Sequence, residues 1–268
     1  MAGRPEGHLG QRGGFAGRVR LRVGPHEGHP QPTPQHMSGH DEHVPYSLPR
    51  HGEGEMRRRL DAMHAHMEAR RSIRHFSPDP VPLDVLERAV HIAGTAPSGA
   101  HKQPWSFCIV TDPALRQRIR TAVEEEEYRS YHGRMSRKWL VDLEPLGTDH
   151  IKPFIEEAPA LIIVFRKVFD RDEVTGEKNP NYYVQESCGI AVGFLLAALH
   201  EAGLAALTHT PSPMNFLAEL LERPENERAF LNIPVGWPAD DARVPNLSRK
   251  RLNEILFHYR PDAHEDGV

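Results

Sequence analysis

Three arginines and a serine lie close together in the segment R-R-S-x-R, which is formed by Arg70, Arg71, Ser72 and Arg74. Guanidinium groups bind phosphate oxygens through pairs of charge-assisted hydrogen bonds, so this density suits an anion. A solvated basic turn explains the same residues without a ligand. A similar composition returns in S-R-K-R at 248–251, which includes Arg249. Either cluster alone is weak support for a phosphate site.

A second group of residues combines an anion, a phenol and a cation. Glu127 and Tyr131 are four residues apart, so they share one face if the segment is helical, and Lys152 follows after Trp139. A carboxylate complements an ammonium group, while a lysine and a phenol complement a carboxylate, so together they suit an amino-acid zwitterion. A charged helix beside an unrelated lysine is the alternative.

The loop PSGAHKQPW at 97–105 supplies a third set of polar groups. Gly99 lets the backbone approach a flat ligand, and Ser98 and Gln103 add a hydroxyl and an amide. An ordinary turn between a helix and a strand is again the alternative.

These residues must be positioned by helices that alternate with short strands. Apolar spacing and turn residues predict helices at 55–71, 83–94, 113–127, 185–202 and 214–223, and strands at 105–110, 159–166, 204–208 and 230–237. The segment 171–181 is predicted to be a loop, and 243–255 an arm of mixed character. Because no regular repeat is present, an α+β sandwich is favoured over a doubly wound sheet.

Nearly every position between Ile190 and Leu199 is small or apolar. In a helix this pattern needs cover around most of the circumference, which predicts either a central core helix or a subunit interface.

The composition excludes several classes of protein. The chain has 268 residues, a formal net charge of −4 and two cysteines, Cys108 and Cys188. These values argue against a disulfide-rich domain and a basic nucleic-acid surface, and the lack of any apolar run approaching about 18 residues argues against a membrane span. We expect a cytoplasmic protein in which both thiols pack as small apolar groups. No metal site is expected, because the histidines of the first segment are scattered.

Residues 1–36 hold eight glycines and five prolines with no apolar period. We expect a disordered leader there, and Met37 offers an alternative translation start that would leave this leader untranslated. An extension and helix at 37–68, a main domain at 69–258 and a flexible tail at 259–268 complete the predicted organisation.

The segments RRSIRHF, AGTAPSGAHKQPWSF, LTHTP, VGWP and RKRL occur in this order between about residues 41 and 255. In this order they resemble the FMN-dependent nitroreductase superfamily, and within it the iodotyrosine deiodinase family. The resemblance implies an α/β/α sandwich with a mixed sheet flanked by helices, in a domain-swapped homodimer that shares its FMN sites. It also implies reductive dehalogenation of halogenated tyrosines, with NAD(P)H or a reductase as the electron source.

The resemblance also implies roles for single residues. The positions that match the family's FMN contacts are Arg70, Arg71, Ser72, Arg74, Pro97, Ser98, Gly99, Thr208, Thr210 and Arg249. Thr210 is implied to hydrogen-bond the flavin N5, and the backbone amide of Ala100 to stabilise a substrate phenolate and bind substrate. Glu127, Tyr131 and Lys152 match a substrate clamp on a lid at about 124–152, which we expect to be mobile without ligand.

Two other functions share the same flavin residues. One is a broad NAD(P)H-dependent reductase of nitroaromatics, quinones or flavins, and the other is a non-catalytic flavin-based sensor of tyrosines. Two histidines stay unassigned: His209 stands where the family often has threonine, and His101 borders the flavin loop.

Overall fold

A computed structural model describes residues 43–259. The predicted leader at 1–36 and most of the predicted tail, 260–268, lie outside the described residues. Residues 43–50 are exposed and form no helix or strand, and they belong to a unit that ends at Arg50. The description below therefore concerns residues 51–259.

The centre of the fold is a four-stranded sheet in the order β1-β2-β6-β5. Its strands are β1 (Trp105–Val110), β2 (Ala160–Lys167), β6 (Glu227–Gly236) and β5 (Ala205–Ala206). All neighbouring strands pair antiparallel, and a parallel bridge between Ser72 and Ala206 continues the sheet beyond β5. The continuous apolar run of β2 is buried on both faces, which makes β2 the centre of the core.

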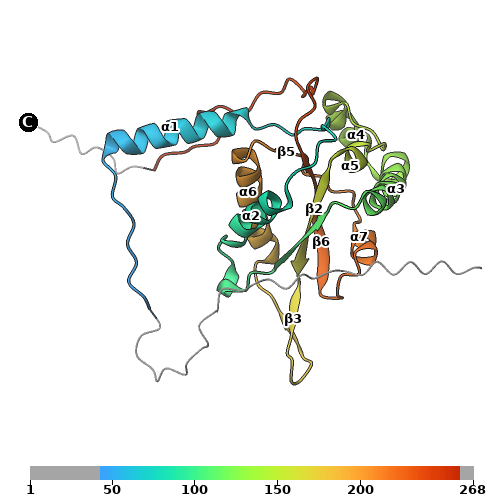
Figure 1. Cartoon of the computed structure of the whole chain (residues 1–268), viewed down its shortest axis with the longest axis horizontal. Coiled ribbons are helices and arrows are strands. Elements are labelled where there is room, and N and C mark those ends of the chain that lie inside the picture. The colour runs from blue at the N-terminus through green and yellow to red at the C-terminus, as the bar shows by residue number, and fades with distance from the viewer. Residues whose placement is uncertain (1–42, 260–268) are drawn as a thin grey trace, which may run out of the picture. The chain divides into compact units, whose positions relative to one another are not determined.

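Helices cover both faces of this sheet (Figure 1). On one face, α2 (Leu83–Gly94) and α6 (Val184–Glu201) pack against Ala160, Ile162 and Val164. On the other, α3 (Pro113–Arg129), α5 (Phe154–Glu157) and α7 (Asn215–Leu220) pack against the alternate side chains of β2. The predicted α/β/α sandwich is confirmed.

The remaining elements surround this sandwich. They are α1 (Glu53–Ala69), α4 (Arg137–Leu143), a π-helical turn at Ser130–Arg134, and 3₁₀ turns at Gly99–His101, Glu144–Leu146 and Leu252–Glu254. No residue of α1 is buried in the single chain. Among residues 43–259, no helix is both long and apolar enough to cross a membrane.

The prediction of a simple loop at 171–181 was wrong. Strands β3 (Phe169–Arg171) and β4 (Lys178–Pro180) form a hairpin there. The carboxylate of Asp172 accepts hydrogen bonds from the backbone N–H groups of Val174 and Thr175, and Gly176 adopts a φ of +73°. This turn chemistry closes the hairpin although its residues are polar.

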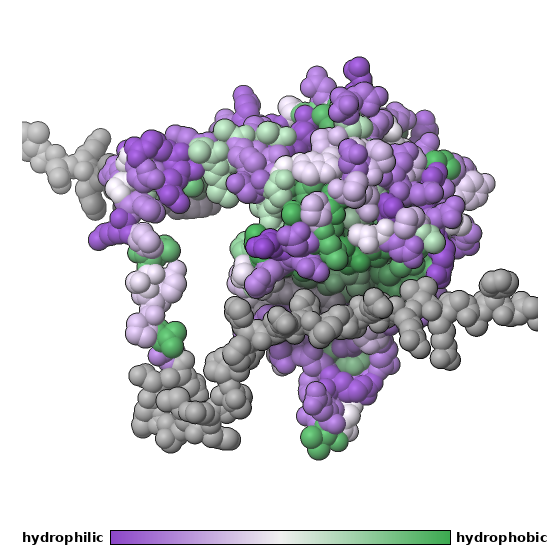
Figure 2. Space-filling view, in the orientation of Figure 1, coloured by the Kyte–Doolittle hydropathy of each residue, from purple (hydrophilic) through white to green (hydrophobic). Residues whose placement is uncertain are grey.

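The apolar helix α6 is covered on one side only in the single chain. Cys188, Leu195 and Leu199 are fully buried, whereas Ile190 and Phe194 are 43% and 40% exposed. Figure 2 shows a largely apolar area below the C-terminal half of α1, in the region of α2 and α6. Burial raises the pKa of Cys188 to about 12, as expected for a packed thiol.

Candidate functional site

A basic cavity of about 330 Å³ lies where the end of α1 meets the edge of the sheet. The backbone N–H of Ile73 donates to the carbonyl of Ala206, so the segment after α1 is held against β5. The cavity brings together six of the predicted residues: Arg70, Arg71, Ser72, Arg74, Thr208 and Arg249. Two segments about 180 residues apart in sequence thus contribute to one anion site.

The arginines of this cavity have few carboxylate partners. Arg249 donates to Glu68 over 2.6 Å and to the carbonyl of Arg70 over 2.9 Å, and Arg71 donates to the carbonyl of Pro245. Within residues 43–259, no carboxylate pairs with Arg70, Arg71 or Arg74. Burial lowers the pKa of Arg74, which is the expected effect of desolvating a cation. This excess of positive charge fits a phosphate dianion such as the phosphate group of FMN.

A second cavity, of about 180 Å³, adjoins the basic cavity and contains the predicted clamp. Its lining includes Glu127, Tyr131, Lys152 and Trp139. The two cavities share Arg74, Leu146, Leu207 and Thr208, so they adjoin.

Helix α3 and the turn after it position the anion and the phenol. The carboxylate of Asp112 accepts from the backbone N–H of Ala114, and Pro113 occupies the first turn, which fixes the start of the helix. The π-helical turn at Ser130–Arg134 then carries Tyr131, four residues beyond Glu127. Such π turns are frequent at functional sites.

The cation of the clamp is buried beside its carboxylate. Nζ of Lys152 lies 3.9 Å from Oε2 of Glu127 and donates to Oγ1 of Thr148 over 2.9 Å. The Lys152 ammonium also lies 5.4 Å from the centre of the Tyr131 ring. Burial lowers the pKa of Lys152, against the opposing effect of Glu127, and burial raises the pKa of Tyr131. A buried pair of this kind interacts more strongly than an exposed one.

The segment after β5 carries the two threonines predicted to face the flavin. His209 exchanges two backbone hydrogen bonds with Asn232 of β6, over 2.9 and 3.0 Å. Side chains alternate along such an extended segment, so Thr208 and Thr210 project away from His209. Both threonines are exposed and line the clamp cavity, while the His209 side chain is 12% exposed.

The loop with Pro97, Ser98, Gly99 and Ala100 lies elsewhere in the chain. It precedes β1, one edge strand of the four-stranded sheet, whereas Thr208 and Thr210 follow β5, the other edge strand. Strands are spaced by about 4.8 Å, so the two edges are about 14 Å apart. Within the described part of the chain, these loop residues line neither of the two cavities.

The backbone of this loop is strained. Ala100, His101 and Gln103 have φ values of +49°, +53° and +47°, a region that L-residues other than glycine rarely adopt. A Cβ on Gly99 would lie 3.0 Å from the carbonyl oxygen of Tyr182. Strain of this kind concentrates at ligand sites, which agrees with a functional loop.

Sequence reasoning left His209 without a role, and the structure brings it to the clamp. Nε2 of His209 lies 3.2 Å from Oε1 of Glu127. The two residues are 82 positions apart. No local spacing signals this contact, because it depends on how β5 and β6 pair.

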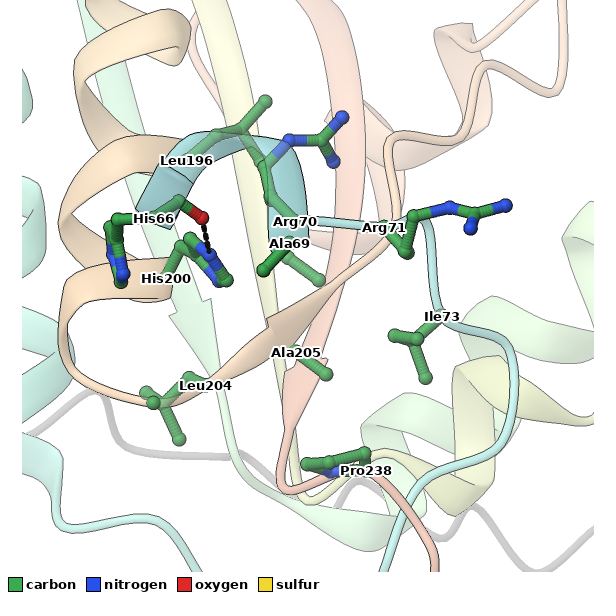
Figure 3. A pocket seen from close by; sticks show the side chains of 12 residues that line it. His66, Ala69, Arg70, Arg71, Ile73, Leu196, His200, Leu204, Ala205 and Pro238 are labelled. Atoms are coloured by element: carbon green, nitrogen blue, oxygen red, sulfur yellow. Dashed lines mark hydrogen bonds between the residues drawn. The ribbon is translucent and has the colours of Figure 1, made fainter. Parts of the chain in front are cut away.

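A further cavity, of about 350 Å³, shares Arg70 and Arg71 with the basic cavity (Figure 3). His66 and His200 stack with ring centres 4.2 Å apart, and the ring of His200 bonds the carbonyl of His66 over 2.8 Å. In Figure 3 the side chain of Arg71 extends away from these histidines. None of the clamp residues lines this cavity.

Comparison with known proteins identifies the family of this chain. The model of the nitroreductase family matches residues 67–237. An iodotyrosine deiodinase of Haliscomenobacter hydrossis is 55% identical over 81% of this chain and 97% of its own length. An iodotyrosine deiodinase of Hydra vulgaris is 43% identical over 82% of this chain and 80% of its own length.

A solved structure is similar to this chain over most of its length. It is an oxidized iodotyrosine deiodinase bound to FMN and 3-iodo-L-tyrosine, with a TM-score of 0.60 and 32% identity, covering 74% of this chain and 98% of that one. The family model and the extent of these matches lead to one conclusion. The chain belongs to the nitroreductase family and, within it, to the iodotyrosine deiodinases.

Proposed function

We propose that this protein catalyses the FMN-dependent reductive dehalogenation of halogenated tyrosines, releasing halide and tyrosine. The observation that supports this most directly is the union of two cavities. The basic cavity and the clamp cavity share Arg74, Leu207 and Thr208 in their linings. The proposed cofactor site and the proposed substrate site therefore adjoin, as a reaction between the two molecules requires.

The clamp residues bind the two charged groups of the substrate. Glu127 accepts hydrogen bonds from the substrate ammonium, and Lys152 and Tyr131 donate to its carboxylate. Because Glu127 and Lys152 are both buried, these bonds form in a medium of low dielectric constant and fix the orientation of the aromatic ring. A general nitroaromatic reductase has no need of such a pair.

The basic cavity holds the cofactor. Arg70, Arg71, Ser72, Arg74 and Arg249 bind the phosphate of FMN. When bound, FMN supplies the reducing equivalents for the loss of halide. The hydroxyl of Thr210 would donate a hydrogen bond to the bound flavin, and Thr208 lines both cavities.

The site is completed by a second copy of the chain. Pro97, Ser98, Gly99 and Ala100 lie at the opposite edge of the sheet from Thr210. A symmetric homodimer brings this loop of one subunit to the cavities of the other, where the amide of Ala100 donates to the phenolate oxygen. The exposed apolar side of α6, with Ile190 and Phe194, supplies the surface for this association.

The lid segment (residues 124–152) closes the site over the substrate. It contains Glu127 and Tyr131 as well as the exposed Trp139, and Lys152 ends it.

Electrons reach the flavin from NAD(P)H or from a separate reductase.

A competition assay tests the proposed function. The purified flavoprotein is reduced with dithionite and offered 3-iodo-L-tyrosine and a nitroaromatic compound in separate reactions and then together. We expect flavin oxidation by the iodotyrosine, with inhibition of any nitroaromatic reduction when both are present. Oxidation by the nitroaromatic alone would favour a general reductase, and binding without oxidation would favour a sensor.

A further inference from the structure

The imidazole of His209 contacts the carboxylate of the clamp directly. Nε2 of His209 lies 3.2 Å from Oε1 of Glu127, while Nζ of Lys152 lies 3.9 Å from the other oxygen, Oε2. The two oxygens of one carboxylate therefore face two different nitrogen atoms. Both the His209 and Glu127 side chains are largely buried, at 12% and 8% exposure.

The chemistry of this contact fixes the tautomer of the ring. An ionised carboxylate only accepts hydrogen bonds, so Nε2 of His209 carries the proton. The other ring nitrogen, Nδ1, is buried and has no hydrogen-bond partner within residues 43–259. Burial lowers the pKa of His209. The negative charge of Glu127 opposes this shift of the pKa, and the positive charges of Lys152 and Arg74 add to it. A neutral His209 holds the carboxylate in place and leaves its negative charge available to a ligand.

His209 is itself held by the rigid part of the fold. Its backbone N–H and carbonyl both bond to Asn232, which is fully buried in β6. Its ring lies edge-on to Phe154 of α5, with ring centres 5.5 Å apart. Glu127, in contrast, lies near the end of α3, at the start of the lid segment. The sheet therefore anchors a carboxylate that belongs to the lid.

We propose that His209 is a positioning residue for Glu127 and that it sets the preference of the site for ligands that carry a protonated α-amino group. This inference rests on the proposed function, because it takes Glu127 as the partner of the substrate ammonium. The contact adds a link between the clamp and the segment that carries Thr208 and Thr210.

Two substitutions of similar polarity separate this role from a general structural one. In His209→Gln the longer side chain places an amide N–H near the position of Nε2, so the bond to Glu127 is kept. In His209→Asn the shorter side chain leaves the amide near the position of Nδ1, so the bond is lost. His209→Thr serves as a second variant that is too short to reach Glu127.

Two ligands isolate the ammonium group. Binding of 3-iodo-L-tyrosine and of its des-amino analogue, 3-(4-hydroxy-3-iodophenyl)propionate, is measured by calorimetry on the FMN-loaded protein. The measured quantity is the ratio of the two dissociation constants, since a loss of fold or flavin would weaken both ligands together.

We expect the preference for the amino ligand to fall about tenfold in His209→Asn and His209→Thr, which corresponds to about 1.4 kcal/mol. The preference should stay within about threefold of the unmodified protein in His209→Gln. An unchanged ratio in the His209→Asn and His209→Thr variants would overturn the inference. So would a fall of the ratio in His209→Gln that equals the fall in the other two variants. If the unmodified protein fails to bind 3-iodo-L-tyrosine, the proposed function itself is overturned.

Discussion

Nζ of Lys152 lies 3.9 Å from Oε2 of Glu127, and the two side chains are 4% and 8% exposed. This distance is too long for a strong hydrogen bond, so the two charged groups are neighbours without a direct hydrogen bond. A zwitterion entering the cavity can offer its ammonium to one residue and its carboxylate to the other. Because the two side chains are not tightly hydrogen-bonded to each other, each can form a new hydrogen bond to a ligand placed between them.

Replacing Lys152 by Gln should weaken the binding of 3-iodo-L-tyrosine by about 10- to 100-fold, because a hydrogen bond to a charged group contributes about 1.5–3 kcal/mol. The flavin content should stay the same, since Lys152 does not line the basic cavity. Calorimetry and the flavin absorbance measure both quantities. Lys178→Gln, at an exposed lysine of the β3–β4 hairpin, is the matched control, and equal affinities in the two variants would remove Lys152 from the clamp.

Replacing Thr210 by Ala should slow dehalogenation by about tenfold or more while leaving hydride-type reductions, such as that of a nitroaromatic, within about twofold. The reason is that the substitution removes the Thr210 hydroxyl, which is the proposed hydrogen-bond donor to the edge of the flavin. Rates of both reactions are compared in the same preparation, with Thr175→Ala in the β3–β4 hairpin as control. Equal losses in both reactions would contradict a specific role for Thr210.

Replacing Arg70 by Gln should lower the affinity for FMN by about tenfold or more, because one charged donor leaves the basic cavity. Arg88→Gln removes an exposed arginine of α2 that pairs with Asp84 and should have no effect. Flavin retained after dialysis, followed by titration with FMN, gives the dissociation constants. A variant of Arg70 that binds FMN as tightly as the Arg88 variant would show that the cavity is not the phosphate site.

The stability of the protein should depend on pH through His209. Burial lowers the pKa of this group in the folded chain, whereas the unfolded group titrates at about 6.5. Between these two pKa values the unfolded chain binds more protons, so the contribution of His209 to stability is lost as the pH falls through that window.

The variant His209→Gln lacks this group. We therefore expect its free energy of unfolding to decline less than that of the unmodified protein between about pH 7.5 and about pH 5. Chemical denaturation at several pH values measures the difference. Parallel curves for the two proteins would show that His209 does not titrate with a lowered pKa.

The sequence predicts those elements whose signals are local. Asp112 and Pro113 mark the start of α3, and the run of apolar residues that forms β2 is recognisable as a buried strand. The spacing of Glu127 and Tyr131 on α3 and its following turn is predictable for the same reason. The β3–β4 hairpin was missed because its polar residues resemble a loop and its turn depends on the side chain of Asp172.

Contacts between distant segments could not be predicted from the residues alone. The approach of His209 to Glu127 follows from the pairing of His209 with Asn232, which no periodicity reveals. The place of Ala100 at the opposite edge from Thr210 likewise follows from the strand order. The family resemblance indicated which residues make up the site, whereas the sheet topology determines which of these residues lie together within one chain.

The most direct test of the account is a single anaerobic turnover. The flavin of the purified protein is fully reduced, 3-iodo-L-tyrosine is added in excess, and tyrosine, iodide and oxidised flavin are measured in the same sample. We predict equal amounts of all three products. Reduced flavin that persists in the presence of bound 3-iodo-L-tyrosine, with neither tyrosine nor iodide formed, would contradict the proposed function.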